Sequence, residues 1–206
     1  MTAPPVLLTG FEPFDGGSVN PTALLMERMA AVEGVATAVL PVEYGTCAAA
    51  FRAAVAQHQP MAALCFGMAA RSDFLLVEQI AWNRDESDRP DNAGVVRPGD
   101  IIAEDGPTAY GTGMPVRFLV RTLAMAGLPV AMSEHAGGFV CNHLFYQVRH
   151  WIETEGLDLP MAFLHVPPLP EQVAGEAGRR GLSLDRLEAG AMALVTTLRQ
   201  ALTGES

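Results

Sequence analysis

A continuous apolar run at residues 61–66 limits the possible folds of this chain more than any other feature. A strand without alternating polar residues is buried on both faces, which is typical of the central strands of a parallel sheet covered by helices. Other short apolar runs alternate along the chain with segments of helical periodicity. This alternation predicts an α/β protein: a three-layer α/β/α sandwich with a mostly parallel or mixed sheet, formed by a single domain over residues 1–206.

Apolar periodicity, caps and breakers predict the individual elements. We expect strands at residues 6–8, 35–42, 61–66, 75–82, 130–133 and 162–166. We expect helices from Asn20-Pro21, at 47–57, at 115–126, from Cys141 to Gly156, and after Ser183, with Asn20 and Ser183 as N-caps. Residues 9–17 and 84–114 are rich in Gly and Pro, so we expect loops there. An irregular stretch as long as 84–114 is typical of a functional or mobile segment, and a solvated surface is the alternative explanation of its charges.

Cys141 lies where an apolar strand and two glycines give way to a helical pattern. The first turn of a helix carries unpaired N–H groups and partial positive charge, which favour a thiolate and can hold an oxyanion. Cys141 is therefore a candidate nucleophile. A small buried core residue is the alternative, and this stretch leaves both interpretations open.

Two further residues can serve such a nucleophile. Residues 162–166 form a buried strand that ends at His165, and an α/β sheet can bring a base to a nucleophile in this way. Glu78 interrupts the apolar side of the strand expected at 75–82. From its position alone, Glu78 is more easily explained as exposed or paired in a salt bridge than as catalytic.

The remaining cysteines and histidines give no metal site. Cys47 and Cys65 are interpreted as core residues, and the odd number of cysteines argues against a disulfide framework. His143 follows Cys141 by two residues and so lies on a different helix face, which argues against a shared metal. We expect no metal and no cofactor.

Charge and hydropathy exclude several partners. The net charge of −10 argues against nucleic acid and anionic membranes. The N-terminus lacks the basic and long apolar segments of a signal peptide, and no run is long enough to span a bilayer. We therefore expect a cytoplasmic protein.

Several segments together resemble the pyroglutamyl peptidases, also called pyrrolidone-carboxylate peptidases, which are cysteine peptidases. The resemblance rests on residues 8–14, 20–22, 78–83, 90–92, 136–146, 165–167 and 169–172, in the order of that family. It implies removal of N-terminal pyroglutamate from peptides by Cys141, His165 and Glu78, through a thioester. It also implies N-terminally pyroglutamylated peptides as partners, no cofactor, and a homo-oligomer, either a dimer or a tetramer.

The same resemblance implies a substrate pocket. Phe11, Phe14, Phe139 and Val140 would enclose the lactam ring, and Asn20 would help to hold the site. Met68 would also contact the substrate, although a glutamine is usual there in the family. The chain departs from the family pattern again at Asp88, where an arginine is common; here Arg89 follows one residue later.

Three alternatives stay open from the sequence. The chain is compatible with a cysteine hydrolase of another small amide, or with a non-catalytic homologue that binds pyroglutamyl groups. A nucleoside-processing enzyme of related fold would need a phosphate-binding loop, and no convincing Gly-rich loop of that kind is present.

Overall fold

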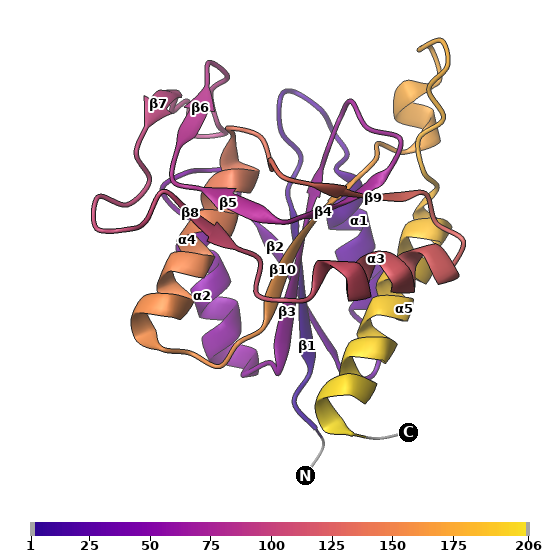
Figure 1. Cartoon of the computed structure of the whole chain (residues 1–206). Coiled ribbons are helices and arrows are strands. Elements are labelled where there is room, and N and C mark those ends of the chain that lie inside the picture. The colour runs from indigo at the N-terminus through magenta and orange to yellow at the C-terminus, as the bar shows by residue number, and fades with distance from the viewer. Residues whose placement is uncertain (1–2, 205–206) are drawn as a thin grey trace.

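A six-stranded sheet runs through the centre of the protein, whose computed structural model describes residues 3–204 (Figure 1). The order of its strands is β2-β1-β3-β10-β4-β9. Their bounds are β1 (Val6–Phe11), β2 (Val35–Leu40), β3 (Ala62–Met68), β4 (Leu75–Glu78), β9 (Val130–Ser133) and β10 (Met161–Val166). The first four strands in this order are parallel to one another. Strand β4 is antiparallel to β10, and β9 is parallel to β4. The predicted α/β class with a mostly parallel, mixed sheet is confirmed.

Helices cover both faces of this sheet. The helices are α1 (Pro21–Met29), α2 (Cys47–His58), α3 (Val116–Met125), α4 (Val140–Glu155) and α5 (Leu184–Thr203), with a 3₁₀ turn η1 (Pro170–Val173) before α5. Helices α1, α3 and α5 pack on one face, while α2 and α4 pack on the other (Figure 1). Among residues 3–204, no helix has the length and apolar character needed to cross a membrane.

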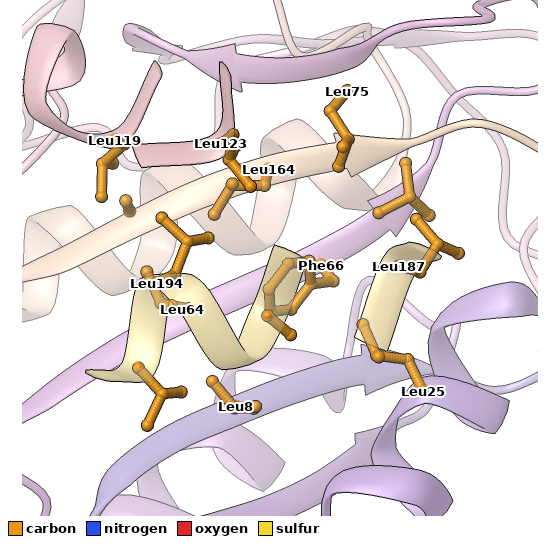
Figure 2. Packing of buried hydrophobic residues seen from close by; sticks show 14 of the residues in the cluster. Leu8, Leu25, Leu64, Phe66, Leu75, Leu119, Leu123, Leu164, Leu187 and Leu194 are labelled. Atoms are coloured by element: carbon orange, nitrogen blue, oxygen red, sulfur yellow. The ribbon is translucent and has the colours of Figure 1, made fainter. Parts of the chain in front are cut away.

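The two faces of the central strands supply two hydrophobic cores. Successive strand residues point to opposite faces, so Leu64 joins the core beneath α5 while Cys65 joins the core beneath α4. Figure 2 shows Leu8, Leu64 and Leu164 of three neighbouring strands gathered on the side covered by α5. Burial on both faces explains why the run at 61–66 contains no polar residue.

Local signals place the helix ends. The Asn20 side chain accepts a hydrogen bond from the Thr22 N–H (3.0 Å), and Pro21 occupies the first turn, as expected. Gly156 ends α4 with a φ of 61°, which is a conformation that glycine adopts without strain. Ser183 is the N-cap residue of α5, as expected, although its side chain makes no capping hydrogen bond within the described residues.

Three predicted boundaries need correction. Strand β1 continues through residues 9–11, which were expected in a loop. The strand expected at 75–82 breaks after Glu78, and β5 (Ile80–Trp82) pairs instead with β8 (Ala109–Gly111). The expected loop 84–114 also holds β6 (Asp85–Ser87) and β7 (Arg97–Asp100), which pair with each other. These strands are too short for apolar alternation to reveal them, and contacts from distant residues hold them in place.

Asn142 of α4 provides such contacts. Its amide nitrogen donates to the carbonyls of Trp82 and Arg84 (both 2.9 Å), and its amide oxygen accepts from the Trp82 N–H (3.0 Å). A buried amide that satisfies three backbone groups fixes β5 and the start of β6 against the helix that carries Cys141.

Candidate active site

Cys141 lies in the first turn of α4, as the sequence predicted. The first hydrogen bond of the helix runs from the His143 N–H to the Phe139 carbonyl (3.2 Å), so the N–H groups of residues 140–142 have no acceptor within the helix. The sulfur of Cys141 sits against β3, because a Cβ added at Gly67 would lie 2.8 Å from it. This position combines a thiol with unpaired N–H donors.

The other two cysteines have a different environment. Cys47 and Cys65 are fully buried, and burial raises the pKa of each thiol to about 12. Cys141 is partly exposed. The two core cysteines therefore stay protonated near neutral pH, as their interpretation as core residues requires.

His165 and Glu78 meet on neighbouring antiparallel strands. The Nδ1 atom of His165 lies 2.7 Å from Oε1 of Glu78, and both side chains are buried. The register pairs Glu78 with Phe163, which places Glu78 two residues from His165 on the same face of the sheet. Because Nδ1 faces Glu78, Nε2 is the ring nitrogen left for other partners.

The pKa of His165 reflects opposing influences. Burial alone would lower it, but interaction with the Cys141 sulfur and with the Glu78 carboxylate outweighs burial and raises the pKa from 6.5 to about 10. The imidazole is therefore held in its protonated form over the physiological range. Cys141, His165 and Glu78 form a connected chemical group rather than three separate residues.

All nine residues proposed from the sequence line one pocket of about 510 Å³. They are Phe11, Phe14, Asn20, Met68, Glu78, Phe139, Val140, Cys141 and His165. Phe14 and Phe139 form an aromatic wall with ring centroids 6.2 Å apart, and Tyr44 packs edge-on against Phe139 at 5.7 Å. Asn20 holds this wall, since its amide nitrogen donates to the Glu12 carbonyl (3.0 Å) while its oxygen caps α1.

Sequence reasoning missed two arginines in this pocket. Arg71 and Arg89 both line it. The guanidinium carbon of Arg89 lies 4.9 Å from the ring centroid of Phe139 and 5.4 Å from that of Phe14. Its place directly before Pro90-Asp91-Asn92 was the available signal, but the sequence does not show that the side chain turns toward the aromatic wall.

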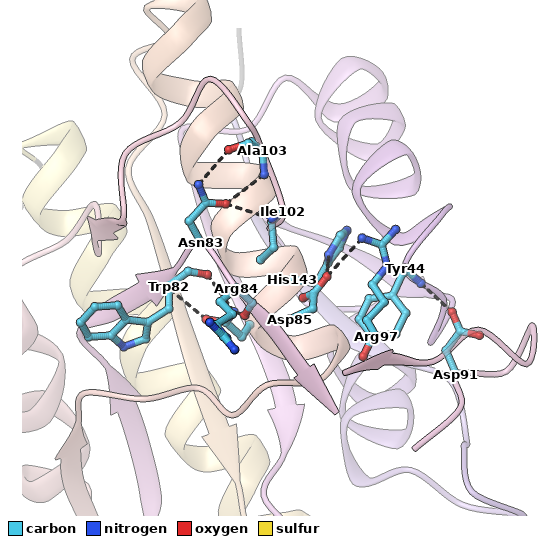
Figure 3. A network of polar contacts seen from close by, with 11 residues as sticks. Tyr44, Trp82, Asn83, Arg84, Asp85, Asp91, Arg97, Ile102, Ala103 and His143 are labelled. Atoms are coloured by element: carbon cyan, nitrogen blue, oxygen red, sulfur yellow. Dashed lines mark hydrogen bonds and ion pairs between the residues drawn. The ribbon is translucent and has the colours of Figure 1, made fainter. Parts of the chain in front are cut away.

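Buried charge also lies behind this wall, so a solvated surface, one of the two interpretations of the charges at 84–114, is wrong for Asp85. Asp85 is fully buried, and its Oδ2 lies 2.7 Å from Nδ1 of His143 and 3.5 Å from the Arg97 guanidinium (Figure 3). Tyr44 packs edge-on against His143 at 5.2 Å. Asp85 and His143 thus join the segment that carries β6 to the helix that carries Cys141.

The same segment is fastened at two more points. A Cβ at Gly138 would lie 2.3 Å from the Glu86 carbonyl oxygen, and the Glu86 N–H donates to the Gly138 carbonyl (2.8 Å). The Asn83 side chain binds the backbone of Ile102 and Ala103 (Figure 3). Gly138 must be small because its backbone is in contact with that of Glu86.

Among residues 3–204, no three His, Cys, Asp or Glu side chains are grouped to hold a metal ion.

Comparison with known proteins agrees with this arrangement. The family model described as pyroglutamyl peptidase matches residues 5–200. A pyrrolidone-carboxylate peptidase of Levilactobacillus brevis is 41% identical over 87% of this chain and 89% of its own length. A protein of the same name from Gloeobacter violaceus is 39% identical over 94% of this chain and 96% of its own length.

Solved structures give the same result. The crystal structure of pyroglutamyl peptidase I from Bacillus amyloliquefaciens superposes with a TM-score of 0.89 at 35% identity, covering 95% of this chain and 96% of that one. A mutant pyrrolidone carboxyl peptidase of Pyrococcus furiosus gives 0.88 at 27% identity, covering 96% and 99%. With a family model that spans nearly the whole chain, and relatives of about two-fifths identity, the chain belongs to the pyroglutamyl peptidase family.

Proposed function

We propose that this protein is a cysteine peptidase that removes N-terminal pyroglutamate from peptides. The observation that supports the proposal is that Nδ1 of His165 lies 2.7 Å from Oε1 of Glu78, in the same pocket as Cys141. The names of the related proteins support the substrate class.

Catalysis begins with a thiolate–imidazolium pair of Cys141 and His165. The thiolate attacks the carbonyl carbon that links the pyroglutamyl group to the next residue. N–H groups in the first turn of α4 stabilise the oxyanion, and loss of one such donor typically costs about a hundredfold in rate. His165 then gives its proton to the leaving amine, which produces a thioester and a shortened peptide.

Hydrolysis of the thioester completes the cycle. Neutral His165 takes a proton from water as the water oxygen attacks the thioester carbonyl, and the tetrahedral intermediate then expels the Cys141 thiolate and releases pyroglutamate. The proton stays on His165, so the starting thiolate–imidazolium pair is restored. Glu78 keeps the imidazole oriented through Nδ1 and stabilises its positive charge in both halves of the reaction, as the third member of a catalytic triad does.

The pocket suits an uncharged lactam ring. Phe11, Phe14, Phe139 and Val140 supply apolar walls for the flat ring. Glu78 is the sole carboxylate among the described lining residues, and it faces His165. An ordinary N-terminal ammonium group would therefore lose its water without gaining a free carboxylate, which disfavours unmodified peptides.

Hydrolysis of pyroglutamyl-aminomethylcoumarin tests the proposal, with Cys141→Ala measured beside the parent. Release of the fluorophore by the parent and none by the variant is the expected result. Residual turnover by Cys141→Ala would exclude Cys141 as the nucleophile. If neither protein releases the fluorophore while Cys141 still reacts selectively with iodoacetamide, the thiol site acts on a different small amide.

A further inference from the structure

The loop that joins β3 to β4 lines the pocket that also holds Cys141 and His165. In the proposed reaction, the lactam ring occupies the aromatic end of the pocket, near Phe14 and Phe139, and His165 faces the leaving amine. His165 is on β10, between β3 and β4, and its register partner on β4 is Leu76. The loop that joins β3 to β4 lines the same pocket together with Leu76, and we place the peptide beyond the scissile bond over this loop.

Arg71 lies in this loop, and the backbone on both sides of it is fixed. The Ala69 N–H donates to the Val166 carbonyl (2.9 Å). Nη2 of Arg179 donates to the carbonyls of Ala70 (3.0 Å) and Ser72 (3.3 Å). Arg71 is thus presented to the pocket from a backbone that a distant part of the chain holds in place.

The charge of Arg71 has no counter-ion among the described residues. The neighbouring carboxylate, Asp73, is bound to Nε of Arg179 (3.1 Å) and to the Gly181 N–H (3.2 Å). The hydrogen bond from Arg179 lowers the pKa of Asp73, so this carboxylate stays ionised and committed to Arg179. Within residues 3–204, Arg71 makes no ion pair and no hydrogen bond. Arg89, the other arginine of the pocket, is stacked on the rings of Phe14 and Phe139.

We propose that Arg71 is a specificity-determining residue that favours pyroglutamyl peptides with a carboxylate on the first leaving residue. The inference rests on the proposed function and deepens it, because it names the leaving group that the same site prefers. The carboxylate comes from an acidic side chain or from the free C-terminus of a dipeptide. A guanidinium group binds either carboxylate through the same bidentate pair of hydrogen bonds. The protein carries a net charge of −10, so an exposed cation in the pocket lining also offsets repulsion of such substrates.

Three substrates separate the two carboxylate sources: pyroglutamyl-Gln-amide, pyroglutamyl-Glu-amide, and pyroglutamyl-Gln with a free C-terminus. The readout is kcat/KM for each anionic substrate divided by kcat/KM for the neutral amide, within one protein. We expect the parent to favour at least one anionic substrate by about two- to fivefold, as for a partly exposed ion pair. The substrate that is favoured identifies the source, and the ratio should fall as NaCl is raised.

Variants assign the preference to Arg71. In Arg71→Gln the ratio should fall to about one, and Arg71→Lys should restore part of it. Arg117→Gln, an exposed change on α3, removes the same charge and should keep the parent's ratio. A parent ratio of one, or a ratio that persists in Arg71→Gln, would overturn the inference while leaving the proposed function intact. Failure of the parent to hydrolyse any of the three substrates would overturn both.

Discussion

Gly67 packs so closely beneath the Cys141 sulfur that the space between them cannot hold a methyl group. A Cβ added at this position would lie 2.8 Å from the sulfur. The same Cβ would approach the Phe163 ring to 3.1 Å. Neither neighbour can move freely, since Cys141 is in the first turn of a helix and Phe163 is fully buried. Gly67 therefore sets the depth at which the sulfur sits over the sheet.

Gly67→Ala should displace the sulfur and impair turnover. A shift of about 1 Å in a reacting group can cost about a hundredfold in rate, and overpacking also costs about 1–3 kcal/mol of stability. The measurement is kcat/KM for the fluorogenic substrate, together with unfolding by urea. Gly175→Ala, where an added Cβ meets nothing within 4 Å, is the matched control. Full activity of Gly67→Ala would show that the sulfur is not confined by β3.

Glu78→Gln should lower the upper pH limit of activity. His165 must be protonated to donate to the leaving amine, and its pKa of about 10 sets the upper limit of the parent's range. Loss of the carboxylate charge lowers this pKa, so the alkaline limb of kcat/KM should move to lower pH. The maximal rate should also fall by about a hundredfold or more, because the imidazole loses its orientation. An alkaline limb at the same pH in both proteins would contradict the role of Glu78.

Iodoacetamide should label the native protein at one cysteine. Burial raises the pKa of Cys47 and Cys65 to about 12, so near neutral pH both stay as thiols and out of reach, whereas Cys141 is partly exposed beside His165. Intact mass and peptide mapping would locate the label. Denaturation before labelling should expose all three cysteines. Rapid labelling of Cys47 or Cys65 in the folded protein would be inconsistent with the packing beneath α4.

Arg89→Gln should weaken substrate binding more than it slows chemistry. The guanidinium of Arg89 packs on Phe14 and Phe139, and a partly exposed contact of this kind contributes about 0.5–1 kcal/mol for each ring. Loss of the guanidinium leaves the aromatic wall less ordered, so KM should rise a few-fold with a smaller change in kcat. Arg84→Gln, which removes an exposed arginine paired with Glu86, serves as the control. A large fall in kcat with unchanged KM would instead place Arg89 in the chemical step.

Asp85→Ala should destabilise the protein strongly. The change leaves His143 and Arg97 without their shared buried carboxylate, and removal of one partner from a buried pair typically costs about 3–5 kcal/mol. Urea unfolding measures the loss. Glu86→Ala is the neighbouring control, since its side chain is 65% exposed and pairs only weakly with Arg84. Equal stability of the two variants would mean that Asp85 does not hold β6 to α4.

By itself the sequence determined the layered α/β architecture. The run at residues 61–66 and residues 161–164 of β10 are apolar throughout because both faces are covered, and this property is visible without knowing their partners. The helix starts at Asn20 and near Cys141 depend on neighbours within a few residues, so local patterns sufficed for them as well.

Only the tertiary structure decided which charges are buried and which arginines face the pocket. Asp85 belongs to a short charged stretch, yet it is fully enclosed because His143, 58 residues later, lies beside it. The break after Glu78 likewise depends on β8 and Asn142, which reach this strand from later in the chain. Family resemblance named Glu78 as the partner of His165, but the register of β4 against β10 was needed to bring their atoms to 2.7 Å. Such contacts join residues far apart in sequence, so no periodicity or cap records them.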